Sequence, residues 1–225
     1  MKLLLVAATR NEIAPLLGEK SCDAGQIVEV NLESGNSISV LITGVGSAAT
    51  LFHLTRLLAV TRYDLVIQAG IAGAFDRNIE LGSVVQIISD RFAQTGAEDG
   101  AVFMDIFEMG LADANTYPFK NGWLQPLPPK NSNPLAITQV TGISVETVHG
   151  HVPHIERIIE KYHPEIESME GAAFFYTCMQ MHIDCLQIRS ISNYVEKRNK
   201  ANWKIPLAVE QLNKNLKDLL NNIIS

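Results

Sequence analysis

The chain has 225 residues, a formal net charge of −6 at pH 7 and a hydrophobic content of 47%. This content is too high for a disordered chain, and an acidic balance without a basic stripe argues against nucleic-acid binding. No run approaches the roughly 20 apolar residues of a membrane span, and no targeting segment is evident at the start, so we expect a globular cytoplasmic protein.

The first half of the chain predicts alternating strands and helices. An all-apolar run at 3–8 predicts a strand buried on both faces. A polar turn at 9–12 opens a short helix that ends near Gly18. Two strand-like runs at 27–31 and 37–43 flank a hairpin turn at 33–36. A helix over about 48–60 and a second apolar strand over 64–71 follow.

The second half continues this alternation after an irregular segment. A strand is predicted at 83–89, followed by a long glycine- and proline-rich stretch over 90–134, which is typical of a functional loop. The remaining elements are a strand at 137–141, helices at 152–162 and 169–181, a strand at 184–190 and an amphipathic helix at 206–224. Strands that alternate with helices predict one α/β domain over 1–225 around a largely parallel sheet.

One glycine motif has the form of a dinucleotide-binding fingerprint. Gly44-x-Gly46-x-x-Ala49 follows a strand and opens a helix. The fingerprint also needs an acidic residue at the end of the next strand, whereas Asp64 begins that strand. We therefore expect no nicotinamide or flavin. The glycines either present backbone N–H groups to a ligand oxygen or simply form a tight turn.

Candidate site residues lie near strand ends, where parallel α/β sheets bind their ligands. The polar or glycine-rich positions there are Glu12, 44–46, 70–73, Glu146 and Asn193. Glu170 joins them, because a carboxylate just ahead of so apolar a helix needs a partner if it is buried.

Three motifs resemble one enzyme superfamily. They are Gly70-Ile71-Ala72-Gly73, Ser168-Met169-Glu170-Gly171-Ala172-Ala173 and Ile188-Arg189-Ser190-Ile191-Ser192-Asn193. In that order, after an N-terminal strand that leads to Glu12, they resemble the nucleoside phosphorylase and nucleosidase superfamily. The layout is similar to that of methylthioadenosine/S-adenosylhomocysteine nucleosidases, and 167–176, 187–196 and 202–208 resemble futalosine hydrolases more closely.

This resemblance covers nearly the whole chain and is weakest over 90–135. It implies a three-layer fold with a central, largely parallel mixed sheet flanked by helices. It also implies hydrolysis of the N-glycosidic bond of futalosine, which releases hypoxanthine and dehypoxanthine futalosine in menaquinone biosynthesis.

The resemblance also implies residue roles. Glu12 would activate the attacking water; from position alone it could equally offset a helix macrodipole. Glu170 would accept hydrogen bonds from both ribose hydroxyls, a pairing that a carboxylate suits, or would be a simple charge at a helix N-terminus. Met169 would pack on the sugar, unless it is a core methionine.

Other positions are expected around the sugar and the base. The resemblance places Ile71 and Gly73 near the sugar and the catalytic water, Val145 over the purine, and Ser192 among the substrate-binding residues. No aromatic residue stands at position 145. Phe92 and Tyr194 are alternative stacking partners for the base.

Asn193 is the most informative position for substrate choice. The methylthioadenosine nucleosidases carry aspartate there, which protonates N7 and accepts from the 6-amino group of adenine. An amide can instead donate to O6 and accept from a protonated N7. Mismatched buried polar groups cost on the order of 1–3 kcal/mol, so this asparagine favours a 6-oxopurine such as hypoxanthine. Alternatively, it caps a turn.

Three alternative functions remain open. The chain could be a methylthioadenosine/S-adenosylhomocysteine nucleosidase or a 6-oxopurine nucleoside phosphorylase, although the turn at 8–12 has no glycine and places an acid where phosphate would sit. It could also be a non-catalytic nucleoside sensor built on the same fold.

No cofactor or metal is predicted. The spacing of His149, His151 and His154 matches no standard zinc pattern, and a polar loop over the site is the interpretation that we favour for them. The three cysteines lack C-x-x-C spacing. The expected partners are a purine nucleoside and, by resemblance, further copies of the chain, with residues 90–110 and their apolar Phe92, Phe103 and Phe107 as contact candidates. For the carboxyphenyl arm of futalosine, Arg10, Arg91 and Lys120 are open options.

Overall fold

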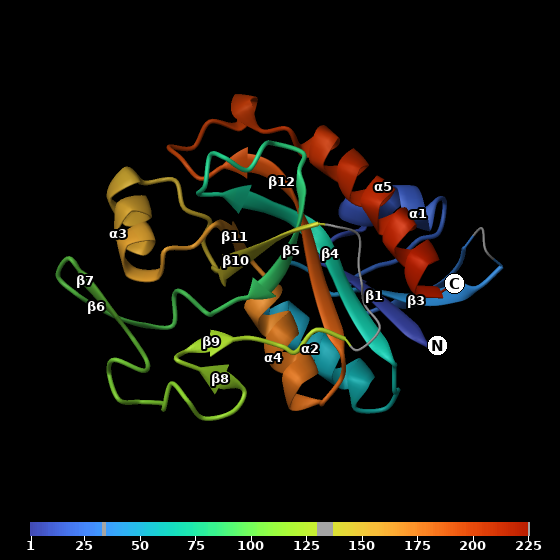
Figure 1. The fold of residues 1–225 in the computed structure, drawn as a ribbon, viewed down its shortest axis with the longest axis horizontal. Coiled ribbons are helices and arrows are strands. Elements are labelled where there is room, and N and C mark those ends of the chain that lie inside the picture. Colours follow the sequence, from blue (N-terminus) through green and yellow to red (C-terminus); the bar gives the residue numbers. More distant parts are fainter. Residues whose placement is uncertain (33–34, 130–136, 225) are drawn as a thin grey trace.

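The computed structural model describes residues 1–32, 35–129 and 137–224. Its centre is an eight-stranded mixed sheet in the order β11-β10-β5-β12-β4-β1-β3-β2 (Figure 1). The strands are β1 (Leu3–Ala7), β2 (Ile27–Asn31), β3 (Ser37–Ile42), β4 (Leu65–Ala74), β5 (Val84–Ser89), β10 (Thr138–Ser144), β11 (Ile166–Ser168) and β12 (Cys185–Tyr194).

One part of this sheet closes on itself. The short strand β11 pairs in parallel with β10 and antiparallel with β4. Strands β4, β12, β5, β10 and β11 therefore form a ring, while β1, β3 and β2 extend it as an open sheet. The α/β class is as predicted, but the simple three-layer description needs this correction. The strand β11 was missed because three residues are too few to show a periodic pattern.

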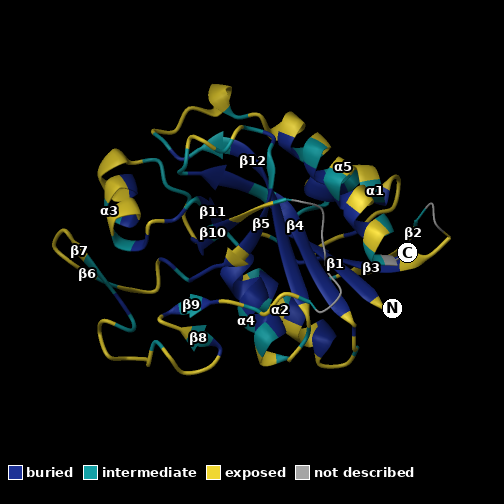
Figure 2. Ribbon diagram, viewed as in Figure 1, coloured by how far each residue is buried: buried dark blue, intermediate teal, exposed yellow. Residues whose placement is uncertain are grey.

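Helices cover both faces of the sheet (Figures 1 and 2). Helices α2 (Ser47–Leu58) and α4 (Gly171–Gln180) lie on one face, and α5 (Ile205–Ile224) lies on the other with the 3₁₀ turn η1 (Arg10–Ile13) and α1 (Ala14–Leu17). The all-apolar strand β1 serves both cores: Leu4 and Val6 pack on the α2 side, and Leu3 and Leu5 on the α5 side. This is why its sequence shows no polar alternation.

The segment that was predicted as irregular contains two small hairpins. They are β6 (Gly96–Asp99) with β7 (Val102–Asp105), and β8 (Phe119–Lys120) with β9 (Trp123–Leu124). A buried ion pair of 2.7 Å between Arg91 Nη2 and Asp105 Oδ2 fixes the first hairpin to the body. Helix α3 (Val152–Tyr162) packs beside it, and η2 (Lys200–Asn202) precedes α5. Residues 130–134 of the segment, and 33–34 of the predicted hairpin turn, lie outside the described residues.

Two strands run further than the sequence predicts. Strand β4 continues to Ala74 and β12 to Tyr194, so Gly73 and Asn193 lie within strands and not in loops after them. A Cβ at Gly70 would lie 2.3 Å from Arg189 Nη1, and one at Gly73 would lie 3.0 Å from Val195 Cγ2, so close approach of neighbouring side chains explains why glycine stands at both positions of this strand. No helix of the described part of the chain is both long and apolar enough to cross a membrane.

Candidate active site

A cavity of about 350 Å³ opens at the ends of β4 and β12, beside the start of α5. Glu12 and Asn193, which are 181 positions apart in sequence, both line it. The predicted residues Ile71, Gly73, Met169, Glu170 and Ser192 line the same cavity. The fold thus brings seven of the eight predicted site residues together.

Glu12 is held rigidly by its own turn and by β4. Its Oε2 accepts hydrogen bonds from the backbone amide of Thr9 at 2.9 Å and from the Thr9 hydroxyl at 3.1 Å, as part of a capping box. Its Oε1 accepts a hydrogen bond from the backbone amide of Ile71 at 3.1 Å. The side-chain amide of Asn213 on α5 donates to the backbone oxygen of Glu12 at 2.8 Å. Burial raises the pKa of the Glu12 carboxyl, and the guanidinium of Arg189 partly opposes this rise.

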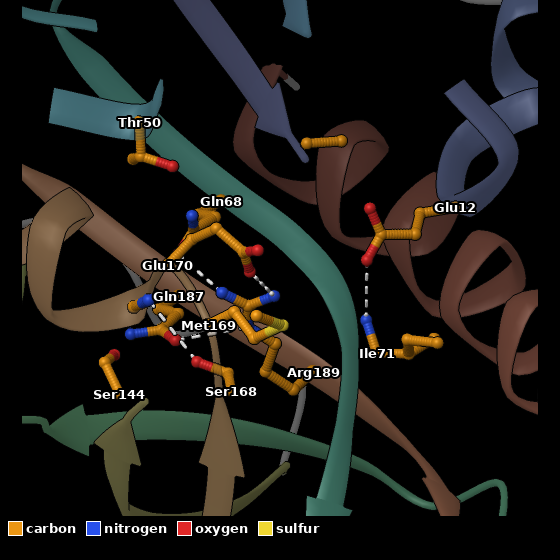
Figure 3. A network of polar contacts seen from close by, with 12 residues as sticks. Glu12, Thr50, Gln68, Ile71, Ser144, Ser168, Met169, Glu170, Gln187 and Arg189 are labelled. Atoms are coloured by element: carbon orange, nitrogen blue, oxygen red, sulfur yellow. Dashed lines mark hydrogen bonds and ion pairs between the residues drawn. The ribbon is translucent and has the colours of Figure 1, made fainter. Parts of the chain in front are cut away.

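Glu170 stands at the N-cap of α4, inside a buried polar network (Figure 3). Its Oε1 accepts from the amide of Gly46 at 3.1 Å, and its Oε2 lies 3.4 Å from Arg189 Nη1. Arg189 is only 1% exposed and also donates to Gln68 and Gln187. Its charge balances that of Glu170, which makes a buried carboxylate tolerable here.

The sequence left two roles open for Gly46, a donor to a ligand oxygen or part of a tight turn, and the structure shows how it is used. Its N–H donates to a carboxylate of the protein, and its φ of +92° explains why glycine stands there. The sequence analysis placed Arg189 in a motif but gave it no role. In the structure, it is the ion-pair partner of Glu170.

Asn193 lines the cavity beside Gly73, its register partner in β4. Its Oδ1 accepts from the hydroxyl of Ser192 at 2.8 Å, and its Nδ2 donates to the backbone oxygen of Tyr194 at 3.1 Å. These contacts fix the amide plane and leave one N–H and one oxygen lone pair unused. The predicted turn-cap role does not apply, because Asn193 lies in β12.

Other residues line the cavity too, and the sequence analysis gave no individual role there to His149, Glu167 or Trp203. His149 and Glu167 form a buried pair: Nδ1 of His149 lies 2.6 Å from Oε2 of Glu167, and the His149 amide donates to Oε1 at 3.0 Å. Trp203 lines the cavity as well. Glu167 lies in β11, and the sequence around His149 indicates a loop. The two side chains come into contact because β11 closes the ring of strands.

Several predicted contacts lie elsewhere. Val145 is buried against Ala93, Ile143 and α3, and it is absent from the described lining of this cavity, whereas Val148 lines it. Phe92 packs on Tyr176, and Tyr194 stacks under Arg77.

The basic residues considered for the carboxyphenyl arm also have other surroundings. Arg91 is paired with Asp105, and Arg10 donates to the backbone oxygens of Gly18 and Lys20. Within the part of the chain that the structure describes, neither of these nor Lys120 lines the cavity, and no Lys or Arg does.

No group of three or more His, Cys, Asp or Glu suited to a metal ion occurs among the described residues. His149 is paired with Glu167, and the rings of His151 and His154 contact each other with centroids 4.6 Å apart. The three cysteines are free and buried.

Comparison with known proteins places the chain in a family. Residues 3–225 match the model of the Phosphorylase superfamily, so the chain belongs to this superfamily. It is 23% identical over 189 residues to a futalosine hydrolase from Thermus thermophilus, covering 83% of this chain and 82% of the relative. It is also 26% identical over 235 residues to a 5'-methylthioadenosine/S-adenosylhomocysteine nucleosidase from Glaesserella parasuis, covering 99% of both.

Solved structures show the same fold. A 5'-methylthioadenosine/S-adenosylhomocysteine nucleosidase from Colwellia psychrerythraea, in complex with adenine, matches with a TM-score of 0.79 at 18% identity, over 99% of this chain and 95% of that one. A futalosine hydrolase mutant of Helicobacter pylori matches with a TM-score of 0.76 at 16% identity, over 98% and 99%. The superfamily predicted from the sequence motifs is confirmed.

Proposed function

We propose that this protein is a purine nucleosidase that hydrolyses the N-glycosidic bond of futalosine and releases hypoxanthine. The single observation that carries this proposal is that Glu12 and the Asn193 amide line one cavity. The first supplies a base for water, and the second supplies donor and acceptor groups for a 6-oxopurine. Curated relatives of both the futalosine and the methylthioadenosine type support the nucleosidase class.

The reaction needs a general base that activates water, contacts that hold the sugar, and stabilisation of the leaving purine. Glu12 is a strong base for a carboxylate, because burial raises its pKa, and it is held in place by Thr9 and Ile71. In the proposed pose, it takes a proton from water that attacks C1' as the C1'–N9 bond breaks. Glu170 accepts from the 2'- and 3'-hydroxyls, and Met169 packs on the ribose, which becomes positively charged in the transition state.

Asn193 is proposed to select the base. Its remaining N–H donates to O6, and its remaining lone pair accepts from N7–H. The 6-amino group of adenine would set donor against donor at the same place. Such mismatches cost on the order of 1–3 kcal/mol in a buried site.

The aromatic arm of futalosine also has a candidate location. Trp203, Ile205 and Val209 form an apolar side of the cavity. The guanidinium of Arg198 lies over the Trp203 ring, 5.1 Å from its centroid. We propose that the arm stacks on Trp203 and that its carboxylate pairs with Arg198, which replaces the basic residues first considered.

Hydrolysis is favoured over phosphorolysis by the charge of the cavity. Glu12, Glu167 and Glu170 line it, and no Lys or Arg appears among its described lining residues. A phosphate dianion would therefore enter a cavity lined by three carboxylates, which Coulomb repulsion opposes.

The test is chromatographic. Futalosine, inosine, methylthioadenosine and adenosine are incubated with the protein, with and without phosphate. The proposal expects hypoxanthine from futalosine at a rate that phosphate does not change. Faster adenine release from methylthioadenosine would establish the alternative nucleosidase, and acceleration by phosphate would establish a phosphorylase.

A further inference from the structure

The catalytic groups assigned so far leave one chemical requirement unmet. The purine departs with the electron pair of the C1'–N9 bond and needs a proton. The Asn193 amide can hydrogen-bond to the base, but it cannot release a proton at neutral pH. Glu12 accepts the water proton and Glu170 is paired with Arg189, so a separate acid is needed at the base end of the cavity.

The pair of His149 and Glu167 lies at that end. Gly73 of β4 is the register partner of Asn193 on one side and of Glu167 on the other. A Cβ at Gly73 would lie 3.2 Å from Asn193 Nδ2 and 3.6 Å from Glu167 Cγ. His149 and Glu167 both line the cavity, with side chains only 8% and 4% exposed.

We propose, on the basis of the proposed nucleosidase function, that His149 is the general acid of the reaction and that Glu167 positions and supports it. Glu167 holds Nδ1–H at 2.6 Å, which directs the ring and stabilises the imidazolium. The proton on Nε2 passes to N7 as the C1'–N9 electron pair moves into the purine. The Asn193 oxygen then accepts from the new N7–H. Solvent later takes the water proton from Glu12 and returns one to His149.

Other charged groups lie near His149 on the side that faces away from the cavity of Glu12 and Asn193. It also lines a second cavity, of about 580 Å³, between the β6–β7 hairpin and α3. The charged or titratable residues there are Glu98, His154, Arg157, Glu160 and Lys161. Arg157 and Lys161 donate to backbone oxygens of the hairpin, and Glu12 and Glu170 face the catalytic cavity. Glu167 is the carboxylate in direct contact with the ring. We therefore expect its removal to disturb the position of the His149 ring more than the removal of any other of these charged groups.

The experiment compares two substrates that differ in their need for a proton. Inosine needs protonation at N7, whereas 7-methylinosine already carries a positive charge there. We expect H149Q to lower kcat on inosine by about 10² to 10⁴-fold, the usual range for general acid catalysis, and to change kcat on 7-methylinosine by only a few fold. The matched control H154Q replaces a histidine that lines only the second cavity and should change neither.

The pH profile gives an independent readout. With inosine, kcat of the wild type should fall at high pH as His149 loses its proton, and this fall should be absent in H149Q. E167Q removes the carboxylate that orients the ring and should lower kcat on inosine more than on 7-methylinosine. Circular dichroism melts of each variant check that it is folded.

The outcomes separate the two proposals. A wild type that hydrolyses neither substrate, nor futalosine, overturns the proposed nucleosidase function and this inference with it. A wild type that hydrolyses both, while H149Q slows both equally or keeps the high-pH fall, overturns the acid role of His149 alone.

Discussion

Glu12 and Arg189 face each other across Gly70. A Cβ at that position would lie 2.8 Å from Glu12 Oε1 and 2.3 Å from Arg189 Nη1. The carboxylate and the guanidinium therefore approach the same point of the β4 backbone from two elements. This closeness explains why Arg189 opposes the rise of the Glu12 pKa, and it connects Glu12 to the group that holds Glu170.

Gly70→Ala should therefore slow catalysis, because it displaces Glu12 and Arg189. The methyl group has no space beside two buried charged groups, and a displacement of about 1 Å can cost 10²-fold in rate. We expect kcat to fall by about that factor. Gly142→Ala is a matched control, because its Cβ would lie 2.9 Å from Ile166 Cδ1 in the same closed ring but outside the cavity lining. If the control loses as much kcat as Gly70→Ala, the effect is general destabilisation.

Glu12→Gln should abolish turnover and spare binding. Glutamine keeps the shape and an oxygen acceptor but cannot take a proton from water, so we expect kcat to fall by about 10² to 10⁴-fold. Isothermal titration with the product hypoxanthine should give an unchanged Kd within a few fold. A wild type that binds nucleosides without any turnover would instead identify the protein as a sensor.

Asn193→Asp should reverse the choice of base. A carboxylate repels O6 and accepts from a 6-amino group, so the ratio of hypoxanthine release to adenine release should fall by about 5- to 150-fold, which corresponds to about 1–3 kcal/mol. Competition between inosine and adenosine measures it. Asn11→Asp adds a carboxylate to the same cavity next to Glu12 and should leave this ratio unchanged. Equal shifts in both variants would mean that charge alone, and not contact with O6, sets the preference.

Asp90 should make stability depend on pH. It is fully buried, and burial raises its pKa from 3.8 to about 7 although Ser144, Gln187 and Arg189 oppose the rise. The folded protein therefore holds this proton up to a higher pH than the unfolded chain does. The free energy of unfolding should fall as pH rises from about 4 to 7, by about 4 kcal/mol from this group, and level off above.

Asp90→Asn removes the titrating group but keeps polar atoms for Ser144 and Gln187. Urea unfolding of the wild type and of this variant, at pH 5 and pH 8, measures the difference. The variant should lose most of the decrease between the two pH values. An equal decrease in both proteins would assign the pH dependence to other groups.

Much of the fold follows from patterns within single segments. The apolar run of β1, the amphipathic stripe of α5 and the helix α3 lie where periodicity predicts them, because each buries a face that its own sequence displays. The ends of β4 and β12 were misjudged, because glycine and serine usually mark turns and here lie inside a closed ring of strands.

The site residues also divide into those that a local pattern predicts and those that depend on a long-range contact. Glu12, Glu170 and Asn193 stand in short motifs near strand ends, so sequence could predict them. His149 and Glu167 could not be predicted as a pair, because their contact needs β11 to join β10 and β4, a long-range pairing without a local signal. Val145 was expected at the site, but it directly follows β10, which ends at Ser144, and it is buried against Ala93 and Ile143.

The hydrogen bond from Asn213 to the Glu12 backbone joins α5 to the turn η1. The lining of the cavity runs from Ala8 to Val209, so it samples almost the full length of the polypeptide. During synthesis on the ribosome, the earliest of these groups emerge long before their counterparts exist. A nascent chain contains β1 and η1 early, but β1 pairs with the later strands β3 and β4, and the lining of the cavity is complete only after α5 has left the exit tunnel and docked.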